Sequence, residues 1–360
     1  MANDATGDAK PAGPFATLGG MRTGIAVMAV IMAAFALWAL RTILTPLALA
    51  LVLLVMIDGM ARAIRMRAPL VPEQAALPAA IVFIVVAFAG AIWAIAANVG
   101  QFAAHSPLYT VKLDALLQWA SARFGFDSPG TVRDLVQEVS PERYLGPAAH
   151  AVRAIGETAI FVLIYLGFLI AARSGIAAKA GALFPDPARR AEADRVFGRI
   201  RSSVESYIWV QTVVGLIIGA ASAVVMAALG LSHVLFWAFV IFLASYIPVV
   251  GAAAGVLLPP LFGFLEFNDL WRPVLMLVLL EAVHFVVSHV IQPRMQGQSL
   301  NLDPIVILLA LALWGLIWGL PGAFLSTPLT AIAMAILAEF ASTRWIAVVL
   351  SSDGKPFGAN

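Results

Sequence analysis

Residues 206–265 read SYIWVQTVVGLIIGAASAVVMAALGLSHVLFWAFVIFLASYIPVVGAAAGVLLPPLFGFL, a run of 60 residues without Asp, Glu, Lys or Arg. As one helix this run would be about 90 Å long, whereas the hydrocarbon core of a bilayer is about 30 Å thick. The chain must therefore reverse within it. The expected first turn is at residues 229–232, and Gly and Pro interrupt the second half at Pro248, Gly251, Gly255, Pro259 and Pro260.

The whole chain has the composition of a membrane protein. Of its 360 residues, 62% are hydrophobic and 12% are charged, and the mean hydropathy is +0.95. Soluble domains are about 45–50% apolar and about 25% charged, so this much apolar surface cannot be buried in one water-facing core. A soluble enzyme, a secreted disulfide scaffold and a disordered chain are excluded. The net charge of +2 is too balanced to indicate a nucleic-acid partner, and the chain has no Cys for a thiolate metal site.

The region before the long apolar run is expected to form a membrane scaffold over residues 21–172. Residues 1–20 are polar, rich in Gly and Pro, and expected to be disordered. Four spans are expected at 23–40, 42–57, 75–104 and 156–172. The first two flank Arg41 and indicate a membrane hairpin rather than a cleaved signal, whose apolar core is about 7–15 residues long. A polar insert at 105–150, which contains a short amphipathic helix, separates the last two spans.

A charged cytoplasmic amphipathic helix is expected at 173–205. Asp186 and Pro187 form the pattern of an N-cap followed by Pro at the first helical position. Apolar residues then recur on one face and arginines on the other, which is typical of a helix lying on the membrane surface. This segment leads without a break into the next span.

Residues 206–340 are expected to form a transport region of two repeated units, each a span followed by a Gly/Pro-broken stretch. The units are 207–229 with 234–265, and 273–290 with 304–338. The last stretch would be about 52 Å long as one helix, too long for one span, and Gly319, Pro321 and Gly322 lie near its middle. Paired interrupted segments at matching positions point to the binding site of a transporter.

The predicted fold is therefore an all-α polytopic integral membrane protein with about six full spans and two re-entrant helical hairpins in an inverted repeat. With this topology, 15 of the 22 Lys and Arg residues lie on the side that holds both termini. The positive-inside rule places that side, including a C-terminal tail at 341–360, in the cytoplasm.

Polar residues inside the apolar segments are the candidates for a transport path. Glu281, His284 and Ser288 share a helix face, and Gln292 extends that face by one turn. A charge in the membrane costs at least about 2.5–3.5 kcal/mol, so Glu281 is a candidate proton carrier that faces the bundle interior. The alternatives are a structural pair of Glu281 with His284 that joins two helices, or a register that places Glu281 among the lipid headgroups.

The first unit and the hairpin tips supply further candidates. Tyr207 and Gln211 begin the span 207–229, where Gln211 either hydrogen-bonds across helices or faces a solute path. Gly215 and Gly219 more simply permit close helix contact. The predicted hairpin tips contain Pro248, Gly251, Pro321 and Gly322. Broken backbone at membrane depth frees N–H and C=O groups that suit a small polar or ionic ligand, although a mere kink is the alternative.

Other chemistries lack their motifs. His284 and His289 are five residues apart rather than four, and HExxH is absent, so no metal site is expected. Neither a Walker-type phosphate loop nor a G-x-S-x-G elbow occurs. The sequence thus predicts no cofactor and no enzymatic activity.

Four motifs occur in order between about residues 185 and 340. They are Tyr207-x3-Gln211-x7-Gly219, Tyr246-Ile247-Pro248-x2-Gly251, Gln292-Pro293-x3-Gly297-x6-Pro304 and Gly315-x3-Gly319-x2-Gly322-x5-Pro328. Together they resemble the autoinducer-2 exporter family. This resemblance implies an inner-membrane transporter, homo-oligomeric with pentamers as a precedent, that exports autoinducer-2 or exchanges sodium or lithium for protons. His289 stands where many members have Asn, which leaves the substrate open.

We therefore predict a secondary transporter or exporter of a small polar solute or signalling molecule, coupled to protons or sodium. A cation/proton antiporter and a passive channel share the same spans and are the alternatives, as is a membrane scaffold without transport. The expected partners are the solute or ion, the lipid bilayer and further copies of the chain.

Overall fold

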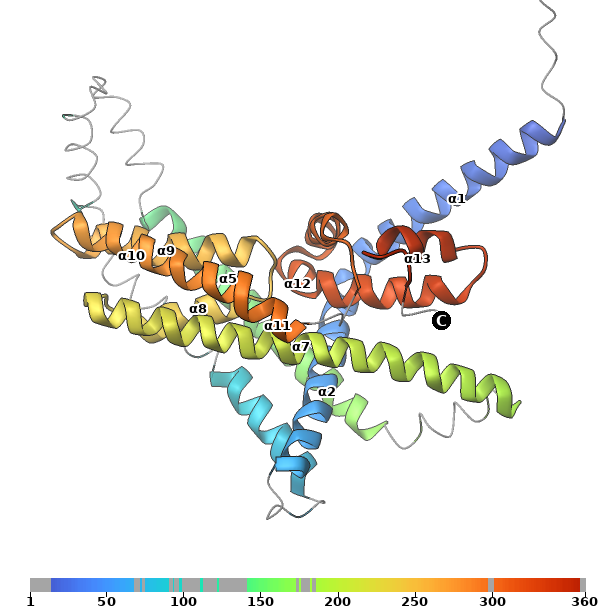
Figure 1. Cartoon of the computed structure of the whole chain (residues 1–360), viewed down its shortest axis with the longest axis horizontal. Helices are drawn as coiled ribbons and strands as arrows, with labels where there is room; N and C mark the ends of the chain where they lie inside the picture. The colour runs from blue at the N-terminus through green and yellow to red at the C-terminus, as the bar shows by residue number, and fades with distance from the viewer. Residues whose placement is uncertain are drawn as a thin grey trace, which may run out of the picture.

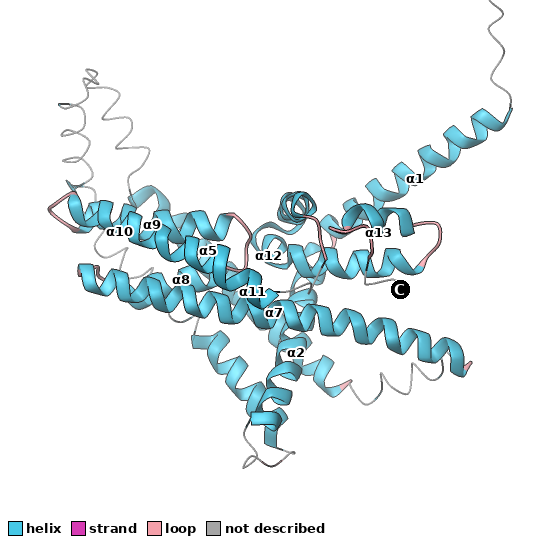
Figure 2. Ribbon diagram, viewed as in Figure 1, coloured by secondary structure: helices cyan, strands magenta, loops and turns pink. Residues whose placement is uncertain are grey.

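The computed structural model describes residues 14–67, 75–90, 141–172, 186–296 and 301–356, with isolated positions between them. Within these residues the structure is helical, apart from one isolated antiparallel bridge between Leu302 and Ser351 (Figure 2). Five of the described helices are long and apolar enough to span a bilayer. The predicted all-α polytopic fold is therefore confirmed. Residues 1–13, most of the predicted insert, most of 91–104 and most of 173–185 lie outside the described residues.

The scaffold begins with α1 (Pro14–Ala39) and α2 (Arg41–Arg67). Residues 14–20, predicted to be disordered, are the first turns of α1, and Pro is favoured at a first helical position because its φ is already helical. The two helices meet at Leu40, next to the predicted turn at Arg41, and then diverge (Figure 1).

The helix α2 packs instead on α5 (Pro141–Ala171) and on the helix at 75–90. Buried side chains from all three, among them Ile57, Ala80 and Val162, form one apolar cluster. This cluster contains no residue of the transport region, so it is the core of the scaffold within the described residues.

The helix α7 (Pro187–Leu229) is a single helix of 43 residues. Its start is as predicted, because the Asp186 carboxylate accepts a hydrogen bond from the Ala188 N–H at 3.0 Å. Gly230, with φ of 81°, ends it inside the predicted turn. At about 65 Å, α7 is about twice as long as the hydrocarbon core is thick. The predicted amphipathic segment and the following span form one continuous helix, so the segment leads into the span without a break, as the sequence predicts (Figure 1).

Two ion pairs attach α7 to the scaffold where its amphipathic part becomes apolar. Arg201 donates to Asp58 of α2 at 2.6 Å. Glu205 accepts from Arg62, one turn further along both helices. The scaffold and the transport region are thus joined through charged groups at one end of α2.

Hairpin 1 consists of α8 (Val234–Ala244), a tip at residues 245–249, and α9 (Val250–Glu266). Val249 has a φ of 64°, which is rare for a β-branched residue. Gly251 lies against α8, because a Cβ added there would collide with the Ala244 carbonyl. The chain therefore reverses within the broken stretch of the first unit.

Hairpin 2 is α12 (Pro304–Glu339), whose backbone leaves the helical conformation at Gly319, with φ of 66° and ψ of −144°. The Trp314 indole N–H donates to Thr330 Oγ1 at 3.1 Å. In a straight helix these residues would be about 24 Å apart along the axis, so the two halves of α12 lie side by side. A Cβ added at Gly322 would collide with the Trp314 carbonyl, which repeats the arrangement of hairpin 1.

The second unit's span is interrupted by a π-helical turn. It comprises α10 (Trp271–Val286), the π-helix η1 (Val287–Ile291) and α11 (Gln292–Gln296). After hairpin 2, α13 (Arg344–Leu350) and the residues up to Pro356 fold back on the start of α12. The segment that was predicted as a C-terminal tail is therefore folded at residues 344–356.

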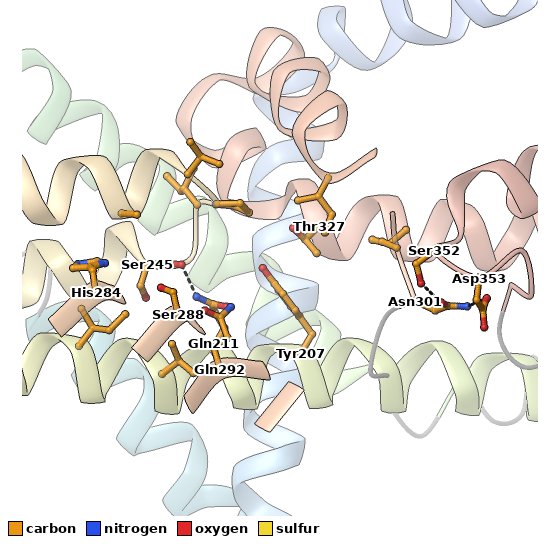
Figure 3. Close-up of a pocket in the computed structure, with 18 residues that line it drawn as sticks. Tyr207, Gln211, Ser245, His284, Ser288, Gln292, Asn301, Thr327, Ser352 and Asp353 are labelled. Atoms are coloured by element: carbon orange, nitrogen blue, oxygen red, sulfur yellow. Dashed lines mark hydrogen bonds between the residues drawn. The ribbon is translucent and has the colours of Figure 1, made fainter. Parts of the chain in front are cut away.

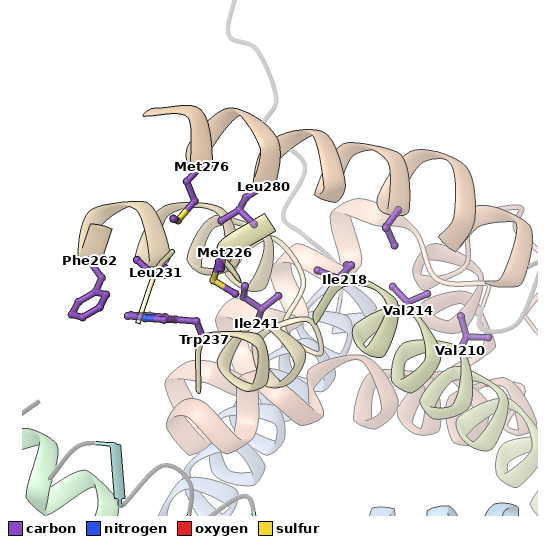
Figure 4. Packing of buried hydrophobic residues seen from close by; sticks show 11 residues of the cluster. Val210, Val214, Ile218, Met226, Leu231, Trp237, Ile241, Phe262, Met276 and Leu280 are labelled. Carbon is purple, nitrogen blue, oxygen red and sulfur yellow. The ribbon is translucent and has the colours of Figure 1, made fainter. Parts of the chain in front are cut away.

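Two apolar clusters meet along α7. One joins α7, hairpin 1 and α10 through side chains such as Ile218, Ile241 and Leu280 (Figure 4). The other joins α7, hairpin 2 and α13 through side chains such as Ile208 and Met334. The space between these two clusters is therefore bounded by both repeated units.

The distribution of polarity is that of a protein surrounded by lipid. Large apolar side chains point outward, including Phe168, Val224, Leu235, Leu316 and Trp345. Polar side chains of the transport region are buried, including Gln211, Ser222, His284, Ser326, Thr327 and Thr330. A soluble protein has the reverse arrangement, so the chain is a multi-pass membrane protein.

Candidate functional site

A cavity of about 480 Å³ lies where α7, the π-helical turn and both hairpins meet (Figure 3). Its polar lining comes from Tyr207, Gln211, Ser245, His284, Ser288, Gln292, Asn301, Thr327, Ser352 and Asp353. Its apolar lining includes Val214 and Ile218 from one core cluster and Leu302 from the other. The cavity therefore lies between the two clusters.

The helix α7 lines the cavity with one face and holds the tip of hairpin 1. Tyr207, Gln211, Val214 and Ile218 recur at helical spacing on that face. The Gln211 amide donates to the Ser245 carbonyl, so Gln211 both joins two elements and lines the cavity. The sequence presented these two roles as alternatives.

The neighbouring residue continues this contact, since the Thr212 and Tyr246 hydroxyl oxygens lie 2.7 Å apart. Further along α7, Gly215 and Gly219 face hairpin 1. A Cβ added at Gly219 would lie 3.0 Å from the Ala238 carbonyl oxygen. As predicted, the small residues permit close helix contact.

His284, Ser288 and Gln292 all line the cavity although they are four residues apart. In an α-helix each such step rotates the side chain by about 40°, which would carry Gln292 away from the face of His284. The π-helix at Val287–Ile291 has a wider turn, which offsets this rotation. The π-helical turn therefore keeps His284, Ser288 and Gln292 on the same wall of the cavity.

Two polar side chains of the cavity lining, His284 and Thr327, are buried. The His284 side chain is 5% exposed, and Nε2 has no partner. Its ring lies against the backbone of α9, where a Cβ added at Gly255 would be 2.8 Å from Nε2. Thr327 is 3% exposed, and the Tyr207 phenol points toward its side chain (Figure 3). Buried polar groups are normally paired, so a bound molecule is a candidate partner for His284 Nε2.

The structure brings together six of the predicted site residues and leaves others apart. Tyr207, Gln211, Pro248, His284, Ser288 and Gln292 line the cavity. Gly251, Pro321 and Gly322 are not among its lining residues and instead shape the hairpins. Glu281 is exposed and does not line the cavity, because three residues of α-helix place it about 60° around α10 from His284.

Five further polar lining residues are not among the predicted site residues, namely Ser245, Asn301, Thr327, Ser352 and Asp353. Ser245 and Thr327 are polar residues inside apolar runs, and that contrast is a signal that could have found them. Ser352 and Asp353 precede Gly354 in a pattern typical of a turn, which suggests a folded segment rather than a tail.

Asp353 is the only Asp, Glu, Lys or Arg among the described lining residues. The Asn301 amide donates to its carboxylate at 2.6 Å, and the Lys355 N–H donates to it at 2.8 Å. These hydrogen bonds hold the pKa of the Asp353 carboxyl below its usual value, so it is charged at neutral pH. Within the described residues, no group of three or more His, Asp or Glu side chains lies close enough to hold a metal ion.

Comparison with known proteins shows the family of the chain. A family model described as AI-2E family transporter matches residues 25–342. The chain belongs to this family. AI-2E family membership makes it a membrane transporter, and the match includes both repeated units and most of the scaffold.

Individual relatives of the AI-2E chain agree with this assignment. The AI-2 transport protein TqsA of Escherichia coli is 32% identical over 168 residues, 47% of this chain and 48% of TqsA. The matched region thus spans about half the length of TqsA. A Haemophilus influenzae protein provisionally named a transport protein is 25% identical over 314 residues, 85% of this chain and 89% of that protein.

Proposed function

We propose that this AI-2E family transporter moves a small, uncharged polar solute across the inner membrane through the cavity between its two units. The observation that carries the proposal is the cavity that both units line with polar side chains, among them His284, whose buried Nε2 has no partner. Leaving such a group unpaired costs about 1–3 kcal/mol. A solute with hydrogen-bonding groups on two sides would bond His284 on one wall of the cavity and Thr327 on another.

The lining supports a neutral solute rather than an anion. No Lys or Arg is among the described lining residues, and the carboxylate of Asp353 is already held by Asn301. The cavity volume of about 480 Å³ is within the range of small-molecule sites, about 300–1,000 Å³. Because TqsA is named for AI-2 transport, autoinducer-2 is the first solute to test.

In this proposal both hairpins are re-entrant, enter the membrane from opposite faces, and both termini are cytoplasmic. The non-helical backbone at Val249 and Gly319 supports such a placement. Backbone of this kind is tolerated at membrane depth only where protein or an aqueous cavity surrounds it. The apolar outer face of the chain would contact lipid or further copies of the chain.

The test substitutes Thr327→Val, which keeps the shape of the side chain and removes its hydroxyl. In proteoliposomes supplied with autoinducer-2, we expect the half-saturating concentration to rise about tenfold, as for one lost hydrogen bond. The unfolding temperature should change little, because the shape of the buried side chain is kept.

The matched control is Ser222→Ala. Ser222 is 0% exposed, like Thr327 carries a buried hydroxyl, and does not line the cavity. Its loss should leave transport unchanged. An unchanged half-saturating concentration for Thr327→Val would overturn the proposed site.

Coupling is tested separately with Glu281→Gln and imposed ion gradients. Full proton-dependent flux in this variant would remove Glu281 from the mechanism. Solute flux that ignores pH and sodium gradients would indicate a passive channel, and sodium–proton exchange without solute would indicate an antiporter.

A further inference from the structure

The end of the chain forms part of the cavity wall. Ser352 N–H donates to the Asn301 carbonyl at 3.0 Å, and Asp303 N–H donates to the Leu350 carbonyl at 3.1 Å. These bonds flank the antiparallel bridge between Leu302 and Ser351. We call residues 301–303 together with 351–355 the C-terminal clasp.

Asn301 is the centre of the clasp. Its amide nitrogen donates to Asp353 Oδ1 at 2.6 Å and to the Lys355 carbonyl at 3.0 Å, and its amide oxygen accepts from the Ser352 hydroxyl. Its φ of 49° presents the side chain to the returning segment in a conformation that Asn tolerates. One side chain therefore holds three residues of the chain end.

The clasp lies at the edge of the cavity. Ser352 and Asp353 line the cavity and are at the same time exposed. Ser351, which precedes them in the chain, and its bridge partner Leu302 are buried. Leu302 packs in the cluster that contains Ala347 of α13. The clasp can therefore open beyond Ser351 while α13 stays packed.

The other polar contacts at the cavity differ from those of the clasp. Gln211 is buried and bonds the tip of hairpin 1 within a packed core. The clasp bonds lie among exposed groups, where water can replace each partner at little net cost. Opening is therefore easiest at the clasp.

We propose that the C-terminal clasp is a cover on the cytoplasmic mouth of the cavity, which must release Asn301 before a solute can enter or leave on that side. The inference rests on the proposed function for the solute and on the distribution of Lys and Arg for the side. It assigns a gating role to residues 351–355.

The first test locks the clasp. The chain has no Cys, so Asn301→Cys with Ser352→Cys introduces the sole thiol pair. These residues oppose each other beside the bridge, and facing residues of an antiparallel pair have Cα atoms about 4.5–5.5 Å apart, which suits a disulfide. With the pair fully oxidised, autoinducer-2 flux in proteoliposomes should fall at least about tenfold and return on reduction. Equal flux in both states would overturn the proposal.

The second test opens the clasp and needs no transport. In a Ser288→Cys background, we measure the rate at which a small water-soluble maleimide labels the cavity thiol in detergent. Asn301→Ala with Asp353→Ala should raise this rate about tenfold. The control, Arg153→Ala with Glu157→Ala, removes an exposed ion pair of α5 and should leave the rate unchanged.

The two tests separate the cover from the proposed function. Faster labelling in a protein that carries no autoinducer-2 would support the cover and count against the solute. An unchanged labelling rate would mean that the clasp is a fixed wall, whatever the flux.

Discussion

The two hairpins reach the cavity with different parts. Hairpin 1 lines it with its tip, through Ser245, Pro248 and Val249. Hairpin 2 reverses at Gly319, which does not line the cavity, and contributes Thr327 from its returning arm. Similar layouts in sequence therefore give one hairpin that presents irregular backbone and another that presents side chains.

The difference follows from how each chain reverses. Hairpin 1 uses five residues, 245–249, and the Ser245 carbonyl freed there is taken up by Gln211. Hairpin 2 reverses at one glycine, so it keeps helical geometry up to its tip. The tips nevertheless meet, because the rings of Tyr246 and Phe324 stack at 4.8 Å. Pairing of the hairpins therefore does not require identical tips.

The largest expected effect tests a feature that both hairpins share, the close contact of a glycine with the backbone of the opposite arm. Gly251→Ala and Gly322→Ala each place a Cβ on a backbone carbonyl of the opposite arm, which cannot move without opening the hairpin. We expect each to lower the free energy of unfolding by about 3 kcal/mol or more, measured by thermal unfolding in detergent.

Gly167→Ala in α5 is the control, because a Cβ there meets nothing within 4 Å. It should stabilise the helix by about 0.5–1 kcal/mol. Collapse of one hairpin variant but not the other would show that the two reversals are packed differently.

A smaller effect tests the backbone conformations at which the two hairpins reverse, which differ between them. Gly319→Ala puts a side chain on a backbone that only glycine adopts easily, and should cost about 1–3 kcal/mol. Val249→Gly should have the opposite sign, with a gain of up to about 1 kcal/mol, because it relieves a positive φ. The Val249 side chain is 62% exposed, so little packing is lost. If both variants destabilise, Val249 contributes contacts that outweigh its strain.

The smallest effect concerns the contact between the tips. A double-mutant cycle with Tyr246→Leu and Phe324→Leu should give a coupling energy of about 0.5–1.5 kcal/mol in thermal unfolding. Tyr246→Leu combined with Phe285→Leu should be additive, since the Phe285 ring stacks on His289 instead. Zero coupling between Tyr246 and Phe324 would mean that the hairpins are stabilised independently.

Features governed by neighbouring residues were predictable. Asp186, Pro187 and Gly230 mark the ends of α7 as the sequence indicates, because capping and left-handed turns depend on adjacent residues. The face shared by His284, Ser288 and Gln292 was also anticipated, but on α-helical spacing. The π-helical turn that holds Gln292 on that face has no local signature in the sequence.

Features that depend on distant segments were not predictable. Glu281 stood out as an acid inside an apolar run, yet it lies on the exposed side of α10. Thr327 stood out less, as a hydroxyl inside an apolar run, and Asp353 lay in a segment predicted as a tail, yet both line the cavity. Whether a polar residue faces lipid or a cavity is decided by the helices packed against it, and one sequence does not contain those positions.

The sequence by itself determined that lipid surrounds the protein, where the apolar spans lie, and where the chain reverses. Transfer free energies add along the chain, and the conformational limits of Gly and Pro act on their own residues. Only the tertiary structure decided that Tyr207, His284, Thr327 and Asp353 surround one space. Their meeting depends on packing between segments far apart in sequence, because side chains combine into a site only after the helices that carry them are in contact.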